Sequence, residues 1–338
     1  MPTLSNSLPD DPAIRARIGS GLDAPVSEET RELAAYLAQA FGPATHSIIH
    51  YGSHAQGSNP GPGSAHDFFV IVDRYAEAYR SLHLSNHIQA SPGVATTLAR
   101  VLPPNVLRVI APLAGGRGPM QAKSAVLSER DLERLCSPRA WDHFTQGRLF
   151  QQVQIAWVRD PESHEAVRET LIRARLNTWW WGRPYLPPRF SAEEYFRRLL
   201  ETSFAAEIRP EGNERVEQLV AAQRAVIVPA YEAVLEHLVA RRIVVPEGKS
   251  YRGATEPTAA ERMAVRAYFA RSKARATARW SKHVALYDDW LGYIVEKIER
   301  RTGQEIELTG KEKRWPLIFL WPRAIEFVRT RPQRKTPT

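Results

Sequence analysis

Two short apolar segments, separated by a stretch too rich in glycine and proline for regular structure, constrain the fold more than any other part of this chain. Thr45–Tyr51 alternates and is rich in β-forming residues, and Phe68–Val72 is a second apolar segment. Gly52 and Ser53 follow the first segment directly, and Gly57–Ser64 consists mainly of Gly, Pro, Ser and Asn. Such residues favour turns. The sequence therefore predicts two strands joined by a turn and a loop, so a β-sheet is part of the fold.

An aspartate, Asp67, opens the second predicted strand beside the Gly52-Ser53 turn. Glycine lets backbone N–H groups approach a phosphate closely, and a serine hydroxyl adds a hydrogen-bond donor. A carboxylate beside bound phosphates is a ligand that Mg²⁺ prefers. Asp73 lies at the other end of the strand, about 20 Å away, so we assign it to the exit turn. The alternative is a surface hairpin in which Asp67 only caps a turn.

This arrangement resembles the signature of the nucleotidyltransferase superfamily, in which a Gly-Ser turn is followed by two acids that alternate with hydrophobic residues. Asp67 matches the second acid, and Ala65 stands at the position of the first. Many members carry a third carboxylate on a central strand, whereas the apolar segment Val106–Ala114 has no acid. The resemblance implies a nucleotide held by Gly52 and Ser53, with Asp67 as the magnesium ligand.

A more specific resemblance covers residues 45–240. The chain is similar to the mitochondrial-type phosphatidate cytidylyltransferases, the translocator assembly and maintenance proteins, which also have Tyr-Gly-Ser and then a single Asp before Phe. Their Lys-containing strand matches Lys123–Val126, and their Gly-Arg-Leu segment matches Gly147–Leu149. A late motif of the family matches Ser203–Val220. The residues carried over from these later motifs are Lys123, Arg148, Glu207, Arg209, Asn213 and Arg215.

The resemblance implies a reaction and a set of roles. CTP and phosphatidic acid would give CDP-diacylglycerol and pyrophosphate, with Mg²⁺ as the cofactor. The implied catalytic residues are Asp67, Lys123 and Arg209, and Asp67 is the metal ligand. The implied nucleotide-binding residues are Gly52, Ser53, Lys123, Arg148, Glu207, Arg209 and Asn213. Two alternatives stay open: a nucleotidyltransferase that modifies a small molecule, RNA or protein, and a non-catalytic protein of the same fold that binds nucleotide or nucleic acid.

Hydrophobic periodicity predicts an α+β protein in which a mixed-sheet domain of the nucleotidyltransferase fold precedes a mainly helical domain. Glu29–Phe41 is amphipathic, with Leu33 and Leu37 on one face. Strands are expected up to about Ser128, with a helical interlude over residues 76–87. Helices follow over residues 129–135, 161–175, 192–207 and 214–241. We therefore expect a flexible N-terminal arm (1–28), a nucleotidyltransferase domain (29–128), a helical domain that completes the active site (129–240) and a basic C-terminal region (241–338).

The positive charge is concentrated in the C-terminal region. The chain has a net charge of +9, and residues 240–338 contain 22 Lys and Arg against 11 Asp and Glu. Arg271–Lys282 is the densest part, and Lys311–Phe327 places tryptophans and aliphatic residues between basic flanks. Such segments suit an anionic membrane surface, and burial in the protein core is the alternative. The same choice applies to Trp179–Trp181.

Composition limits the remaining classes. A single cysteine, Cys136, excludes a disulfide framework and is expected in the core. No apolar segment is long enough to span a membrane, and no defined nucleic-acid module is present, so no specific nucleic-acid partner is expected. His83 and His87, four residues apart, have no zinc-type partners nearby and indicate a phosphate contact or plain surface. We expect a cytoplasmic enzyme peripherally associated with the inner face of the membrane.

Overall fold

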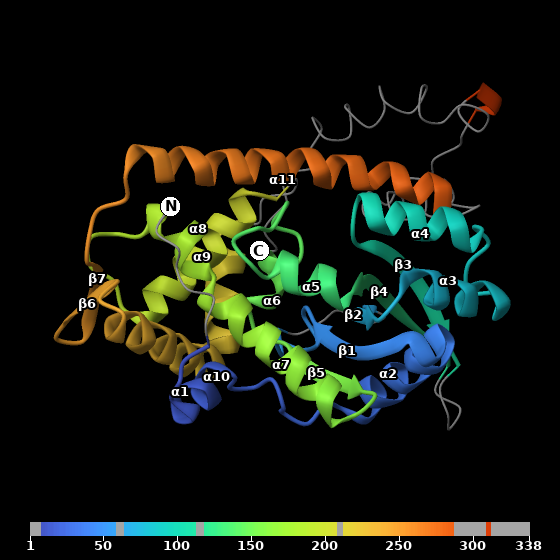
Figure 1. Ribbon diagram of the computed structural model, residues 1–338, viewed down its shortest axis with the longest axis horizontal. Coiled ribbons are helices and arrows are strands. Elements are labelled where there is room, and N and C mark those ends of the chain that lie inside the picture. The colour runs from blue at the N-terminus through green and yellow to red at the C-terminus, as the bar shows by residue number, and fades with distance from the viewer. Residues whose placement is uncertain (1–7, 59–63, 113–117, 208–211, 287–308, 312–338) are drawn as a thin grey trace, which may run out of the picture. The chain divides into compact units, whose positions relative to one another are not determined.

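The computed structural model describes residues 8–58, 64–112, 118–207, 212–286 and 309–311 (Figure 1). It confirms the predicted fold class, because a mixed five-stranded sheet is combined with a large helical region. The strand order is β3-β4-β2-β1-β5. The bounds are β1 Thr45–Tyr51, β2 His66–Val72, β3 Asn105–Ala111, β4 Met120–Ser128 and β5 Gln154–Val158.

The two strands first predicted from sequence are neighbours in the sheet. β1 pairs antiparallel with β2, and the register places Tyr51 opposite Asp67. β2 starts at His66, two residues earlier than predicted, so Asp67 lies inside the strand. β4 runs parallel to β2 on its other side, and β3 and β5 are antiparallel edge strands. The sheet therefore takes its last strand, β5, from beyond residue 128.

One face of the sheet is covered by three helices: α2 (Glu28–Phe41), α3 (Tyr75–Leu84) and α4 (Pro92–Val101). Ser27 caps α2, because its hydroxyl accepts a hydrogen bond from the Thr30 amide. α2 contacts β1 and β3, and α4 contacts β3. The strand residues on this face are fully or almost fully buried: Ile48, Phe68, Val70, Leu107 and Val109.

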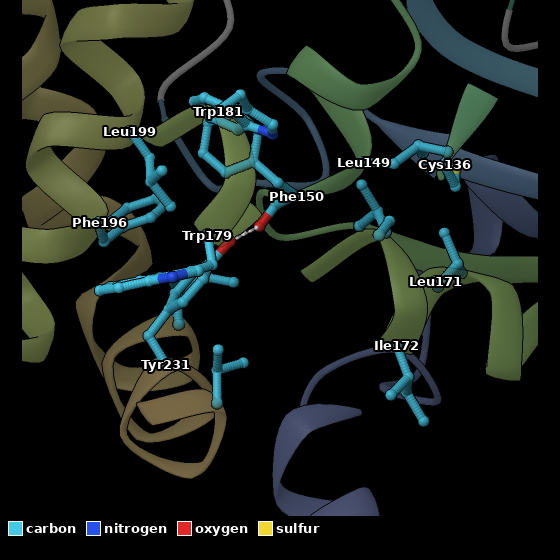
Figure 2. Packing of buried hydrophobic residues seen from close by; sticks show 14 of the residues in the cluster. Cys136, Leu149, Phe150, Leu171, Ile172, Trp179, Trp181, Phe196, Leu199 and Tyr231 are labelled. Carbon is cyan, nitrogen blue, oxygen red and sulfur yellow. Dashed lines mark hydrogen bonds between the residues drawn. The ribbon is translucent and has the colours of Figure 1, made fainter. Parts of the chain in front are cut away.

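The helical region packs against the other face. Its helices are α5 Glu129–Leu135, α6 Gln146–Leu149, α7 Pro161–Leu176, α8 Thr178–Gly182, α9 Ala192–Ala205 and α10 Asn213–Ala240. One hydrophobic cluster runs from Ile49 and Phe69 in the sheet to Trp181 and Tyr231 in this region. Figure 2 shows its helical part, with Trp181, Phe196 and Tyr231 around Phe150. Apolar burial of this kind is the main stabilising contribution to the fold.

The tryptophan run belongs to this core. Trp179 and Trp181 are 2% and 0% exposed, and Trp180 packs against the cluster from its edge. Figure 2 shows the Tyr231 hydroxyl donating a hydrogen bond to the Phe150 carbonyl, at 2.9 Å. Cys136 is buried as expected, and burial raises the pKa of its thiol. The core alternative for Trp179 and Trp181 is therefore correct.

The N-terminal segment differs from the flexible arm expected over residues 1–28. Within its described part, α1 (Pro12–Ile18) begins at the capping residue Asp11. Ile18 and Leu22 are fully buried, and Arg17 pairs with Glu236 of α10 at 2.5 Å. Ile14 and Ile18 are spaced four residues apart, as in an amphipathic helix. This helix has only 7 residues, which is too short for its periodicity to be recognised from sequence.

Beyond α10, a hairpin of β6 (Val244–Glu247) and β7 (Ser250–Gly253) leads into the long helix α11 (Ala259–Leu286). Gly42–Ala44 and Arg183–Tyr185 each form a single turn of 3₁₀-helix. In the part of the chain that the structure describes, no helix combines the length and apolar character needed to cross a membrane.

The basic segment Arg271–Lys282 lies in α11, and most of its charged side chains bind other groups of the protein. Arg271 donates to the carbonyls of Ala140 and Trp141. Arg275 and Arg279 pair with the fully buried carboxylate of Asp142. Lys282 donates to the carbonyls of Leu98, Leu102 and Pro104. These four cations attach the helix to the protein, whereas Lys273 is exposed. Of the second segment, Lys311–Phe327, all but Lys311 lies outside the described residues.

Candidate active site

The turn after β1 brings Gly52 against the carboxylate of Asp67. Gly52 has φ +80°, a conformation that L residues with side chains rarely adopt. A Cβ at this position would lie 2.8 Å from Asp67 Oδ2. The Gly52 carbonyl accepts from the Gln56 amide at 3.0 Å, and the Ser53 carbonyl accepts from the Ser58 amide at 3.1 Å. A glycine is therefore needed here for both its backbone angle and its lack of a side chain.

Glutamine side chains hold the turn in place. Gln56 Nε2 donates to Gln151 Oε1 at 3.0 Å, and Gln152 Nε2 donates to the Ala55 carbonyl at 3.0 Å. The Gln152 amide donates to Gln223 Oε1 of α10 at 2.8 Å. Buried amide networks of this kind fix one geometry, because each unpaired polar group in the interior costs free energy. The Gly52–Ser58 turn is thus attached to the helical region.

Lys123 lies beside Asp67 because β2 and β4 are in register at these two residues. The Lys123 Nζ is 3.8 Å from Asp67 Oδ1. The side chain of Asp67 is 26% exposed and that of Lys123 is 45% exposed, so both can be reached by a ligand. Sequence reasoning searched Val106–Ala114 for a third carboxylate, but the strand next to β2 is β4, and it presents this lysine.

Arg148 reaches the site from α6, on the β1 side of Asp67. Its side chain hydrogen-bonds the hydroxyl of the buried Tyr51, and it forms an ion pair with Glu207, with 3.5 Å between Nη1 and Oε1. Nη1 also donates to the Phe144 carbonyl at 2.8 Å, and the guanidinium lies 3.9 Å from the centroid of the Phe144 ring. The guanidinium of Arg279, from α11, lies 4.8 Å from the same centroid. Phe144 therefore contacts both Arg148 and α11.

The electrostatics of Asp67 fit a bound cation. Burial raises the pKa of the Asp67 carboxyl above its usual value, although Lys123, Arg148 and His54 act in the opposite direction. The charged carboxylate is therefore incompletely compensated by the protein. The described residues contain no group of three His, Cys, Asp or Glu side chains able to hold a metal ion. One carboxylate suits Mg²⁺ that is also bound by substrate phosphates, because this ion uses few protein ligands.

The structure brings most of the predicted site residues together. Gly52, Ser53 and Asp67 share the turn and the strand beside it, and Lys123, Arg148 and Glu207 surround them. Asn213 is exposed at the start of α10, and no contact joins it to Asp67. Two residues later, Arg215 donates to the Ser58 hydroxyl at 3.3 Å, so this helix end lies near the turn. Arg209 lies outside the described residues.

Sequence reasoning missed a stack of histidines on the covered face. The rings of His54 and His66 are stacked with centroids 3.8 Å apart, and His50 and His66 are stacked at 5.3 Å. His66 Nδ1 lies 3.3 Å from His50 Nε2, and His50 Nδ1 lies 3.3 Å from Gln154 Oε1. His50 and His66 come from antiparallel strands, so the pairing could be found only once the strand register was known. His83 is exposed on α3, and His87 lies 3.4 Å from the Tyr36 hydroxyl.

Comparison with known proteins finds no family model and no curated protein that matches the chain.

Proposed function

We propose that the protein is a magnesium-dependent nucleotidyltransferase that uses CTP and phosphatidic acid as substrates. The observation that carries the proposal is the contact between the Gly52 turn and the partly desolvated carboxylate of Asp67, with Lys123 3.8 Å away. Transfer from a nucleoside triphosphate requires a turn that can donate hydrogen bonds to phosphate oxygens. It also requires a nearby carboxylate whose negative charge the protein compensates only in part.

The nucleotide side of the site is formed by the Gly52-Ser53 turn and Arg148. Arg148 presents a planar donor group suited to phosphate oxygens, and its ion pair with Glu207 holds it in place. Asp67 together with the triphosphate would bind Mg²⁺, which neutralises charge on the transferred and leaving phosphates. This assignment keeps Gly52, Ser53, Arg148 and Glu207 in nucleotide binding.

The chemistry is a displacement at phosphorus. An oxygen of the acceptor phosphate forms a bond to the α-phosphorus of CTP, and the bond from that phosphorus to the pyrophosphate oxygen breaks. The nucleophile is already an anion at neutral pH, so no general base is needed. Lys123 and Arg148 stabilise the charge that builds on the phosphate oxygens. CTP as the donor and phosphatidic acid as the acceptor follow from the resemblance over residues 45–240.

The test is pyrophosphate release by the purified full-length protein with Mg²⁺, each of the four nucleoside triphosphates, and phosphatidic acid in mixed detergent micelles. Release that requires both CTP and phosphatidic acid is the expected result. Equal release with any nucleotide, or none with the wild-type protein under all conditions, contradicts the proposal. An absence of pyrophosphate release combined with tight CTP binding would favour the non-catalytic alternative.

A second candidate is transfer to a soluble acceptor. The observation in its favour is that Arg271, Arg275, Arg279 and Lys282 bind carbonyl and carboxylate groups of the protein itself. The sequence had suggested that these charges contact an anionic membrane surface. Membrane association would then depend on other parts of the basic C-terminal region. Pyrophosphate release with a water-soluble acceptor and none with lipid would select this candidate.

A further inference from the structure

Four side chains form one row across the sheet at the open end of the site. The register places Arg108 of β3 opposite Lys123 of β4, Lys123 beside Asp67 of β2, and Asp67 opposite Tyr51 of β1. Residues directly opposite each other on paired strands project on the same side, with Cβ atoms about 5 Å apart. The candidate site thus continues from Asp67 past Lys123 to Arg108 at the edge strand.

Burial along β3 shows which side of the sheet this row occupies. Leu107 and Val109 are each 2% exposed on the face where α4 contacts β3. Val106 and Arg108 are partly buried, and Ile110 is 49% exposed. Val106 packs at the edge of the cluster that joins the sheet to the helical region. Arg108 therefore projects on the side of Asp67 and Lys123, away from α4.

The carboxylate of Asp67 lies between positively charged side chains on its two sides. Arg148 contacts Tyr51 on the β1 side of Asp67, whereas Lys123 and Arg108 follow on the β4 side. Lys123 and Arg108 therefore place two positive charges on the β4 side of Asp67.

We propose that Arg108 and Lys123 bind the phosphate of the acceptor, on the side of Asp67 opposite Arg148. This inference rests on the proposed function and assigns Arg108, which no sequence motif indicated, as a residue that sets acceptor specificity. In-line displacement at phosphorus needs the attacking and leaving oxygens on opposite sides. Arg148 on the leaving side and the Lys123–Arg108 pair on the attacking side meet that requirement.

The surroundings of Arg108 also fit an acceptor larger than inorganic phosphate. The exposed Ile110 is two residues along β3 on the same face and lies opposite Gln121. An apolar and an amide side chain next to a phosphate position suit a phosphate monoester that carries a carbon chain. Glycerol 3-phosphate and a short-chain phosphatidic acid share the phosphate and differ in the acyl chains, so comparing them separates a soluble source from a lipid.

The experiment compares Arg108→Gln with Arg100→Gln, a matched loss of one positive charge from the exposed end of α4 on the other face. Initial rates of pyrophosphate release are measured against CTP, dihexanoyl phosphatidic acid and glycerol 3-phosphate. Arg108→Gln is expected to raise the KM of the acceptor about tenfold, as loss of one charged hydrogen bond does, with the KM for CTP unchanged. Arg108→Lys should recover part of the affinity, and Arg100→Gln should behave as wild type.

An unchanged acceptor KM in Arg108→Gln, or an equal change in Arg100→Gln, overturns the assignment of Arg108. Failure of the proposed function looks different, because the wild-type protein then releases no pyrophosphate. In that case calorimetric binding of dihexanoyl phosphatidic acid and of glycerol 3-phosphate tests the same residue. Weaker binding in Arg108→Gln alone supports the phosphate position, and no binding, or equal binding in all variants, contradicts it.

Discussion

His66 and Asp67 are consecutive residues of β2, and the two faces of the sheet give them opposite environments. On the covered face, His66 is 2% exposed and stacks between other imidazoles, and burial lowers the pKa of His50 and of His66 to about 4. On the other face, against which the helical region packs, Asp67 lies beside Lys123 at the open end of the site and is accessible to a ligand. Helix α2 packs over the histidines, where Thr30 Oγ1 lies 3.4 Å from His66 Nδ1, whereas Asp67 and Lys123 remain accessible. The comparison shows that access to a ligand, rather than residue type, separates a structural titratable group from a candidate catalytic one.

The strongest test of the open end of the site is Asp67→Asn. Removing the carboxylate beside the turn should lower turnover about 10³-fold, in the range seen when a main electrostatic group is lost. The fold should be retained, because burial opposes the charged form of Asp67. Pyrophosphate release and thermal unfolding measure the two quantities. Asp73→Asn is the matched control, since Asp73 pairs with Arg159 at 2.5 Å beyond the other end of β2. Full activity in Asp67→Asn would remove the central claim.

Gly52→Ala tests the contact between the turn and Asp67. The added Cβ would meet Asp67 Oδ2 at 2.8 Å and would also strain the positive φ. We expect a loss of about 1–2 kcal/mol in the free energy of unfolding and a fall in turnover of about 100-fold. Denaturant unfolding and initial rates are the measurements. Gly57→Ala is the control, because Gly57 has a positive φ of 62° but a Cβ added there would meet nothing within 4 Å. Equal turnover in the two variants would show that the contact with Asp67 is unimportant.

Arg148→Ala tests the β1 side of the open end of the site. Loss of a guanidinium that binds phosphate should raise the KM for CTP about tenfold, or about 1.4 kcal/mol, with little effect on the KM of the acceptor. Arg108→Gln is expected to raise the KM of the acceptor and not the KM for CTP. The two variants together therefore test which side of Asp67 binds each substrate. Glu207→Gln removes the ion pair but keeps the guanidinium and should give a smaller change. A change in acceptor KM alone for Arg148→Ala would reverse the assigned sides.

The histidines on the covered face are tested by the pH dependence of protein stability. Because the folded-state pKa values of His50 and His66, about 4, are below the ordinary value of 6.5, the unfolded chain binds more protons between pH 4 and 6.5. Stability is therefore fully present above pH 6.5 and falls as the pH decreases toward 4. His66→Phe should reduce the loss between pH 6.5 and 5 by about 1 kcal/mol. The measurement is urea unfolding at both pH values.

His83→Gln, a change at an exposed histidine, serves as the control for this measurement. If His66→Phe and wild-type protein lose stability equally between pH 6.5 and 5, the stacked histidines are not the neutral groups described above.

The elements with strong local patterns could be predicted from the sequence, and the contacts between them could not. α2, β1, α5, α7 and α10 lie within one or two residues of the predicted ranges, because their periodicity and caps are local. β5 was missed since it is short and half-buried between helices. The structure brings together five residues that the resemblance assigns to one site: Gly52, Asp67, Lys123, Arg148 and Glu207. Arg108 and the histidine stack depend on strand register, which no local pattern specifies.

The two guanidinium groups on Phe144 have a consequence for how the chain can be shortened. Arg148 belongs to the candidate site. Arg279 of α11 contacts the same ring and also forms an ion pair with Asp142. A protein truncated before Ala259 would lose that second cation, expose Asp142 and free the ring on which Arg148 rests. Helix α11 is thus part of the structural support of the candidate site, and a shortened protein made to test the proposed activity has to include it.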